Sequence, residues 1–278
     1  MKELFDKVSA KCSKSVTQSY STSFSLGIYF LDKKFHPSIY GIYGFVRLAD
    51  EIVDSFHDFD KAVLMKRFRE DTVLAIEQKI SLNPILNAFQ QAVNTYTIDW
   101  YLIDTFLKSM EMDLQQTEHT GDSYNQYILG SAEVVGLMCL RVFVESDSAL
   151  YDRLKPFAMK LGSAFQKVNF LRDLNADYNI LGRTYFPEVN FNSFTIEDKH
   201  LIEKEIGDEF DEALVGIKNL PTSSRRGVYL AYIYYRSLFE KIKNTPASQL
   251  MNERIRVSDH HKIGLMFRSL VRNKLNWL

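Results

Sequence analysis

The chain has 278 residues, of which 46% are apolar and 25% are charged, and its formal net charge is -1 at pH 7. This balance gives no electrostatic basis for nucleic-acid binding, so no nucleic-acid partner is expected. Cys12 and Cys139 are the only cysteines. They are too few for a disulfide scaffold or a thiolate metal site, and they favour a cytoplasmic location.

Glycines and prolines are sparse, and they fall mostly between long segments of helical periodicity. No segment shows convincing strand alternation, apart from a short ambiguity at 184–189. The pattern predicts an all-α protein with a single domain over residues 1–278 and helices packed around a central core. Helices are predicted at residues 2–19, 22–31, 36–56, 60–79, 83–95, 99–116, 123–144, 149–178, 197–219, 222–243 and 247–276.

We expect the sequence to contain neither a signal peptide nor a membrane anchor. The N-terminus carries charges every few residues, unlike a signal peptide. The most apolar run, Val134 to Val144, is interrupted by Arg141 and is too short for a membrane span. We therefore expect no transmembrane segment.

The helix predicted at 36–56 carries an acidic seam. Tyr43, Arg47, Asp50 and Asp54 follow one another at steps of four, three and four residues, which places them on one helical face. The positions between them are largely apolar. This pattern indicates a packed helix with one polar stripe.

A second seam lies more than a hundred residues later. Gln166, Asn169, Asp173 and Asp177 are spaced by three, four and four residues, again on one helical face with apolar flanks. One D-x-x-x-D pair is common in proteins. Two such pairs, each with further aligned polar groups, form a more specific signal.

Four carboxylates that face one another across a bundle repel strongly unless cations lie between them. Oxygen ligands suit Mg²⁺, with Mn²⁺ as the alternative, and Mg²⁺ usually binds substrate phosphates as well. A diphosphate held in this way is a good leaving group, and an allylic isoprenoid tail would suit an apolar, aromatic-lined cavity. The alternative is structural, with the acids paired to Arg47, Arg172 or other bases.

Several ordered motifs span most of the chain. They are Ser21-Thr22-Ser23-Phe24, Asp50-Glu51-Ile52-Val53-Asp54, Ser131-Ala132-Glu133-Val134-Val135-Gly136, Gln166 to Asp177, and Gly182-Arg183-Thr184-Tyr185-Phe186-Pro187. These motifs resemble those of the squalene/phytoene synthase family, and the tail from Arg254 to Val257 resembles the end of the bacterial phytoene synthases.

The resemblance implies an all-α isoprenoid synthase bundle around an apolar cavity and head-to-head joining of two prenyl diphosphates through a cyclopropyl diphosphate. It also implies residue roles. The metal ligands would be Asp50, Asp54, Asp173 and Asp177, and these four would be catalytic together with Tyr43 and Arg47. The substrate-binding residues would be Ser21, Phe24, Arg47, Gln166, Asn169, Arg172, Arg183 and Tyr185.

Some positions leave alternatives open. Glu133 departs from the family pattern, in which many members carry a small residue beside the cavity, and this acid either points away or alters the path of the cation. Asp113 lies near a helix end and could belong to the site, but solvated charge is the favoured interpretation. Phe106, Leu107, Met110 and Leu114 form a stripe that is more typical of core than of cavity.

The expected product is phytoene, formed from two geranylgeranyl diphosphates in carotenoid biosynthesis. The sequence shows no dinucleotide-binding motif, and we expect no C-terminal anchor of the kind that eukaryotic squalene synthases carry, which favours phytoene over squalene. Phytoene formation ends by proton loss, so no NADPH is expected. Ile28, one turn beyond Phe24, is modest in size and would leave depth for a longer tail. The alternatives are a C15-using dehydrosqualene or squalene-type synthase and a non-catalytic assembly factor. Oily substrates suggest peripheral contact with the inner membrane face.

Overall fold

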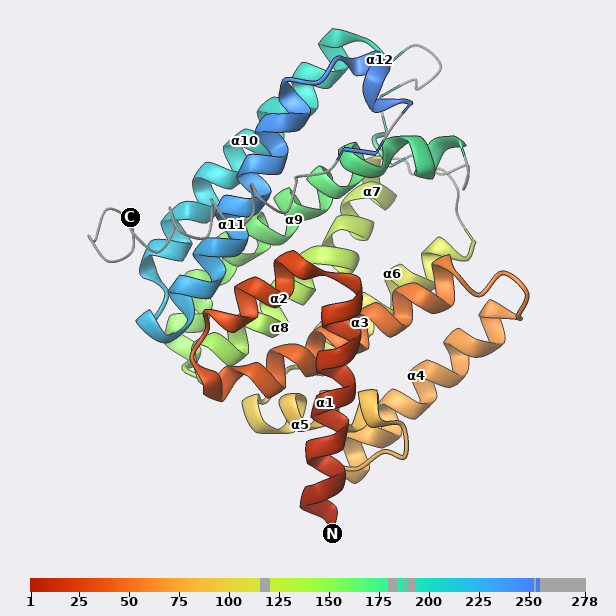
Figure 1. The fold of residues 1–278 in the computed structure, drawn as a ribbon, viewed down its shortest axis with the longest axis vertical. Helices are drawn as coiled ribbons and strands as arrows, with labels where there is room; N and C mark the ends of the chain where they lie inside the picture. The colour runs from red at the N-terminus through yellow and green to blue at the C-terminus, as the bar shows by residue number, and fades with distance from the viewer. Residues whose placement is uncertain (116–120, 180–184, 188, 190–193, 253, 256–278) are drawn as a thin grey trace.

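The structure is a computed structural model that describes residues 1–115, 121–179, 185–187, 189, 194–252 and 254–255, without the side chains of 176–179. The described residues form helices and no strands, which confirms the all-α prediction (Figure 1). The α-helices are α1 Lys2–Tyr20, α2 Thr22–Tyr29, α3 His36–Asp54, α4 Lys61–Gln78, α5 Pro84–Tyr96, α6 Trp100–Asp113, α7 Gly121–Ile128, α8 Val134–Phe143, α9 Ser148–Asn179, α10 Ile196–Asn219, α11 Thr222–Lys243 and α12 Ala247–Leu250.

Capping residues explain where several helices begin. Ser21 adopts an extended conformation between α1 and α2, and its hydroxyl accepts a hydrogen bond from the Phe24 N–H at 3.2 Å. Asn83 caps α5 in the same way, with Pro84 in the first turn of the helix. Thr195 and Asp198 form a reciprocal capping box at the start of α10.

Two predicted helices differ from those observed. The helix predicted at 123–144 is interrupted by a π-helical turn, η2 Leu129–Glu133, between α7 and α8. In place of the helix predicted at 247–276, the structure has a short helix that ends at Leu250, and Arg254 and Ile255 are not helical. The region beyond Ile255 lies outside the described residues. A further short 3-10 helix, η1 Lys33–Phe35, precedes α3.

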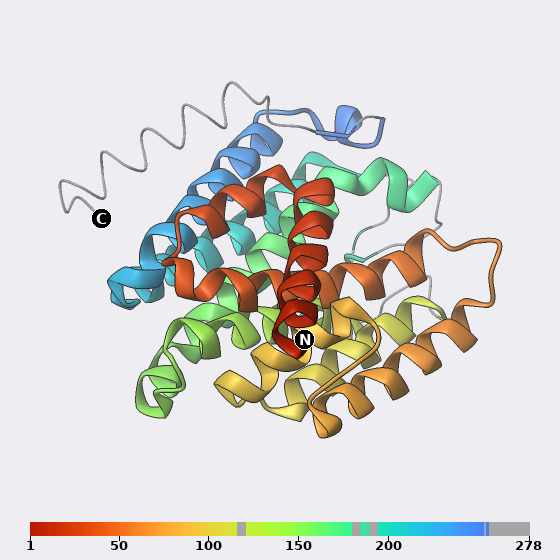
Figure 2. The same ribbon diagram turned by 60° about the horizontal axis from the view of Figure 1, so that its bottom comes forward.

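The apolar side chains gather in two clusters. The first joins α3, α4, α5, α6 and α8, with Phe45 fully buried and stacked on Phe89 at a ring-centroid distance of 3.9 Å. The second joins the C-terminal half of α9 to α10 and α11 around Phe210. Figure 2 views the molecule with the start of α1 toward the reader, and α3 runs behind it.

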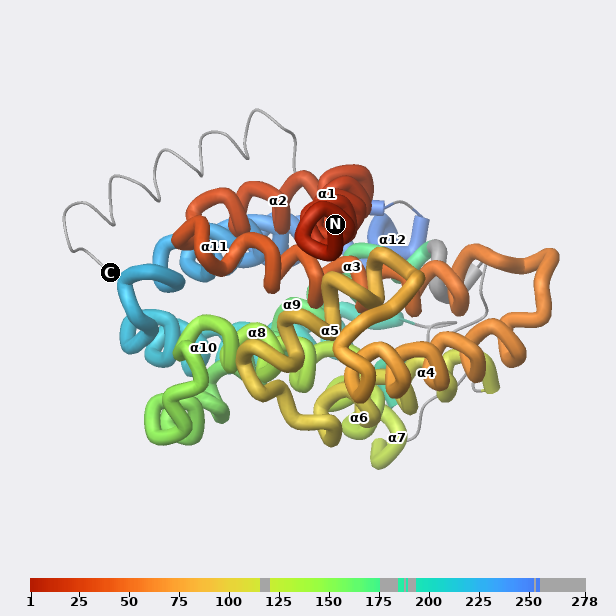
Figure 3. Tube along the Cα trace, turned by 90° about the horizontal axis from the view of Figure 1, so that it is seen from below, coloured from red at the N-terminus to blue at the C-terminus, as the bar shows by residue number. Residues whose placement is uncertain are grey.

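The position of α3 and α9 determines where a site can form. Figure 3 shows α1 and α2 on one side of the molecule and α6 and α7 on the opposite side, with α3 and α9 between these layers. The two helices that carry the acidic seams therefore both lie inside the bundle. The acid-bearing part of α3 contributes apolar residues to the first cluster and that of α9 to the second, and a cavity lies between them.

Candidate active site

A cavity of about 540 Å³ opens between α2, α3, η2, α8, α9 and α11. This volume lies within the range of small-molecule sites. Its deeper wall is apolar and includes Ile28, Leu31, Phe143, Leu154 and Leu220. One end is polar, because both acidic seams reach it. The cavity thus joins a charged end to a long apolar interior.

The first seam occupies the α3 wall, where Tyr43, Arg47, Asp50 and Asp54 all line the cavity. Arg47 Nη1 lies 3.8 Å from Asp50 Oδ2, and Arg47 Nη2 donates to the Glu51 carboxylate. The Arg47 guanidinium also lies over the ring of Tyr20, 4.3 Å from its centroid. Arg47 therefore balances part of the negative charge on this wall, as the structural alternative anticipated.

The acids on α3 nevertheless carry more negative charge than the local bases balance. Burial and the neighbouring charges of Asp54 and Asp113 raise the pKa of Asp50 to about 7, although Arg47 acts in the opposite direction. A carboxyl with such a pKa is only partly ionised at neutral pH. A cation placed between these acids would favour the ionised form.

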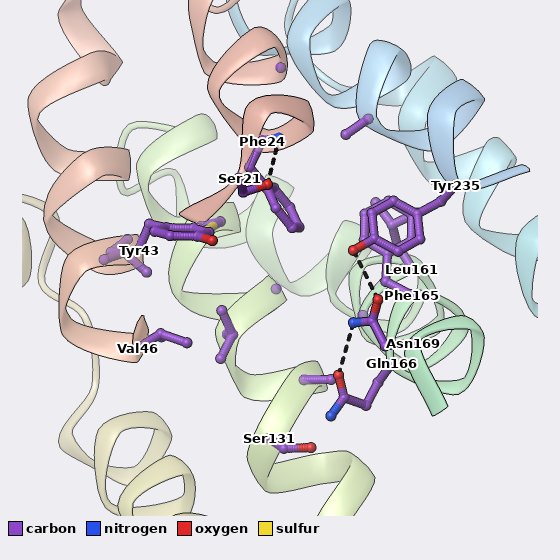
Figure 4. A pocket seen from close by; sticks show the side chains of 18 of the residues that line it. Ser21, Phe24, Tyr43, Val46, Ser131, Leu161, Phe165, Gln166, Asn169 and Tyr235 are labelled. Carbon is purple, nitrogen blue, oxygen red and sulfur yellow. Dashed lines mark hydrogen bonds between the residues drawn. The ribbon is translucent and has the colours of Figure 1, made fainter. Parts of the chain in front are cut away.

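The second seam forms the α9 wall. Tyr235 on α11 donates its hydroxyl to Asn169 Oδ1 at 3.2 Å, and Asn169 Nδ2 donates to Gln166 Oε1 at 3.4 Å (Figure 4). These bonds fix both amides toward the cavity. Arg172 Nε donates to both oxygens of Asp173 at 3.1 Å, and Arg254 Nε lies 2.6 Å from Asp173 Oδ1. The bond and charge of Asp173 raise the pKa of Arg172 against the effect of its burial.

The remaining predicted site residues divide into two groups. Ser21, Phe24 and Tyr185 line the same cavity. Arg183 and the side chain of Asp177 lie outside the described residues, so their predicted roles stay predictions. All the other predicted site residues lie at one cavity, although α3 and α9 are far apart in sequence.

Aromatic rings surround the boundary between the polar end and the apolar interior. Figure 4 shows Tyr43 on one wall, Phe24 above the cavity, and Phe165 and Tyr235 on the opposite wall. Phe165 stacks on Tyr235 at a centroid distance of 3.9 Å, and Phe24 lies 5.6 Å from Tyr43. Burial raises the pKa of Tyr43 to about 12, so its hydroxyl stays protonated. Such faces can stabilise a positive charge that develops between them.

Asp113 occupies the less favoured of its two predicted positions. We favoured solvated charge, but Asp113 lines the cavity and accepts a hydrogen bond from the Tyr127 hydroxyl at 2.7 Å. Its spacing from Met110, which also lines the cavity, is three residues along α6. That spacing was the available signal, because the two share a helical face. Phe106 and Leu107, by contrast, are fully buried core.

Glu133 points away from the cavity, which was the first of the two alternatives for this departure from the family pattern. Its neighbours Ser131 and Ala132 line the cavity, whereas Glu133 does not. Burial and the charge of Glu209 on α10 raise the pKa of Glu133, against the effects of Lys167 and Lys160. The acid therefore faces the back of α9 and leaves the cavity wall to smaller residues.

The described residues fit a divalent cation only in part. No group of three or more described acidic, histidine or cysteine side chains is close enough to hold an ion by itself. Mg²⁺, however, usually takes one or two protein carboxylates together with water and substrate phosphate. Asp50 and Asp54 on α3 and Asp173 on α9 supply that kind of donor at a site with excess negative charge.

The family model for squalene/phytoene synthase matches residues 17–214. The chain belongs to the squalene/phytoene synthase family. Among curated relatives, phytoene synthase 1 of Solanum lycopersicum is 23% identical over 262 residues, which cover 87% of this chain and 62% of that protein. The 4,4'-diapophytoene synthase of Staphylococcus haemolyticus is 26% identical over 196 residues, which cover 68% of this chain and 66% of that protein. The chain spans less than two thirds of the length of these relatives.

Solved structures show the same fold. A dehydrosqualene synthase crystal structure with a ligand superposes with a TM-score of 0.83 at 20% identity, covering 97% of this chain and 98% of that one. The squalene synthase HpnC from Alicyclobacillus acidocaldarius gives a TM-score of 0.75 at 20% identity, covering 89% and 96%. The predicted isoprenoid synthase fold is therefore confirmed.

One helix of this family member meets a simple test for membrane spans. Residues Gly121–Phe143, which comprise α7, η2 and α8, are long and apolar enough by length and composition, although we expected no such run. The helix packs against α6 and α9, and 44% of its most apolar window is buried. Core helices pass the same test, so the indication is weak.

Proposed function

We propose that this chain is a divalent-metal-dependent synthase that joins two allylic prenyl diphosphates head to head, with two geranylgeranyl diphosphates and phytoene as the first candidate pair. One observation carries the proposal. Two acid-bearing helices, α3 and α9, line the same polar end of an apolar, aromatic-lined cavity. Membership of the squalene/phytoene synthase family supports the reaction class.

The residues at the polar end of the cavity would bind the cation and the diphosphate. Asp50, Asp54 and Asp173 would hold the cation, with Asp177 as the fourth predicted ligand. When bound, Mg²⁺ stabilises the negative charge on a departing diphosphate. Arg47 and Arg172 lie at the same end and supply further positive charge.

The apolar interior would receive the prenyl tails and exclude water from the reacting carbons. Phe24, Tyr43, Phe165 and Tyr235 would face the allylic cation left by the first diphosphate. The double bond of the second substrate attacks that cation, and ring closure with loss of a proton gives a cyclopropyl diphosphate. Departure of its diphosphate and rearrangement then give a second cation, and loss of a proton from this cation gives the hydrocarbon without a reductant.

A second candidate uses C15 substrates. The dehydrosqualene synthase structure and the diapophytoene synthase relative favour it, because their names denote products that are built from two C15 units and are shorter than phytoene. Both candidates require the same acids. They differ in the length of tail that the apolar interior accepts and, for squalene, in a need for NADPH.

The test is incubation of the protein with geranylgeranyl or farnesyl diphosphate and Mg²⁺, with and without NADPH, followed by identification of the hydrocarbon and measurement of released diphosphate. Asp50→Asn and Asp173→Asn should each lower turnover by about a hundredfold or more, since each removes a carboxylate that would hold the cation acting on the leaving group. Asp71→Asn on α4 is a matched control, because its partner Arg67 is exposed. Unchanged diphosphate release in both site variants would remove the metal hypothesis.

A further inference from the structure

The segment after α11 reaches the polar end of the cavity. It comprises residues 246–255, of which 253 lies outside the described residues, and we name it the C-terminal strap. Leu250 is fully buried and Ile255 is 4% exposed, both in the second apolar cluster. Asn175 on α9 donates its Nδ2 to the Asn252 carbonyl at 2.7 Å. The strap backbone is therefore anchored beside α9.

Arg254 extends from this strap to a predicted metal ligand. Its Nε lies 2.6 Å from Asp173 Oδ1, and its Nη2 lies 3.4 Å from Asp173 Oδ2. Arg172 donates to the same carboxylate. Both oxygens of Asp173 thus already face guanidinium groups, which donate hydrogen bonds and carry positive charge.

A cation and a guanidinium cannot share these oxygens without cost. Each positive charge at contact distance repels the other, and the oxygen lone pairs that accept from nitrogen are the ones that a metal needs. Arg172 is the chain neighbour of Asp173 and stays close to it. Arg254 is different, because its side chain is 50% exposed and can move into solvent while Leu250 and Ile255 hold the backbone.

We propose that Arg254 acts as a surrogate cation on Asp173, so that a divalent metal binds the substrate-free protein only by displacing it. The proposal rests on the proposed metal role of Asp173. It makes the strap a regulator of metal affinity: the Asp173 carboxylate stays paired with Arg254 when metal is scarce, and metal loading exchanges one cation for another. The strap backbone stays in place during this exchange.

The size of the effect follows from the exposure of the pair. Partly exposed ion pairs contribute little, so removing this competitor should tighten metal binding by about two- to fivefold. The measurement is Mn²⁺ binding to the substrate-free protein by electron paramagnetic resonance, with Mg²⁺ calorimetry as a second readout. Arg254→Gln should bind more tightly than the unchanged protein. Arg254→Lys, which keeps the charge, should lie close to it.

Two further variants separate the explanations. Arg67→Gln also removes one exposed arginine, but on α4, where its side chain is 77% exposed, and it should leave metal affinity unchanged. Asp173→Asn should weaken binding. If Asp173→Asn weakens binding but Arg254→Gln binds no more tightly than the unchanged protein, the competition does not exist. If Asp173→Asn leaves binding unaltered, the proposed metal role itself fails. Thermal unfolding of each variant verifies that the fold is intact.

Discussion

At the scale of single residues, Glu133 shows how an acid can lie near a cavity without serving it. It is partly buried behind α9, beside Glu209 on α10. Lys167 Nζ donates to Glu209 at 2.8 Å and to Glu205 at 2.5 Å, so the base that most lowers the pKa of Glu133 is already shared between two other acids. Glu133 is therefore poorly compensated, which agrees with its raised pKa.

This imbalance predicts a pH-dependent stability. Unfolded Glu titrates near pH 4.3, whereas folded Glu133 keeps its proton to higher pH, so the folded state binds more protons and its stability falls as pH rises through that window. Glu133→Gln removes the titrating carboxyl, so its stability does not fall with pH in this window. We expect its Tm to match the unchanged protein near pH 4 and to exceed it near pH 8, by roughly 2–4 °C for each kcal/mol. Equal differences at both pH values would contradict this account.

At the scale of elements, the contact between α9 and the π-helical turn sets one wall of the cavity. A Cβ on Gly162 would lie 2.7 Å from the Ala132 carbonyl oxygen and 3.1 Å from Glu133 Cα. Both are backbone atoms, which cannot turn aside as a side chain can. The two elements therefore approach as closely as they do only because residue 162 is glycine.

Gly162→Ala should lower the free energy of unfolding by about 1–3 kcal/mol, since it forces backbone atoms apart in a packed interior. Urea unfolding measures the change. Gly207→Ala on α10 is the matched control, because a Cβ there meets nothing within 4 Å. In that half-buried but open helical position, alanine should stabilise the protein by up to about 1 kcal/mol. A loss of similar size in both variants would indicate a general effect of alanine.

The apolar interior offers a test of tail length. Ile28 on α2 lines the cavity one turn beyond Phe24 and is 3% exposed. A larger ring at this position would occupy depth that a tail needs. Ile28→Phe should therefore shift the preferred substrate from C20 towards C15, measured as the ratio of products from an equal mixture of the two diphosphates. An unchanged product ratio would argue against this position as the determinant.

At the scale of the whole molecule, the sequence predicted the helical class because 3.6-residue periodicity is local and strong. It also predicted which faces carry acids, and the structure brings Asp50, Asp54 and Asp173 to one cavity. The π-helical turn was not predictable, because a one-residue change of helical register leaves the composition unaltered. Arg254 was not predicted as a cavity residue, and Asp113 was considered for the site but not favoured, because both come from other elements and their positions depend on how the strap and α6 pack.

The separation of the apolar residues into two clusters has a consequence for cohesion. The acid-bearing part of α3 belongs to the first cluster and that of α9 to the second, with the cavity between them. A bound substrate that contacts both walls would add apolar contacts to both clusters at once and so connect them. Binding should therefore make unfolding more cooperative as well as less favourable, since neither cluster could then unfold without releasing the bound substrate.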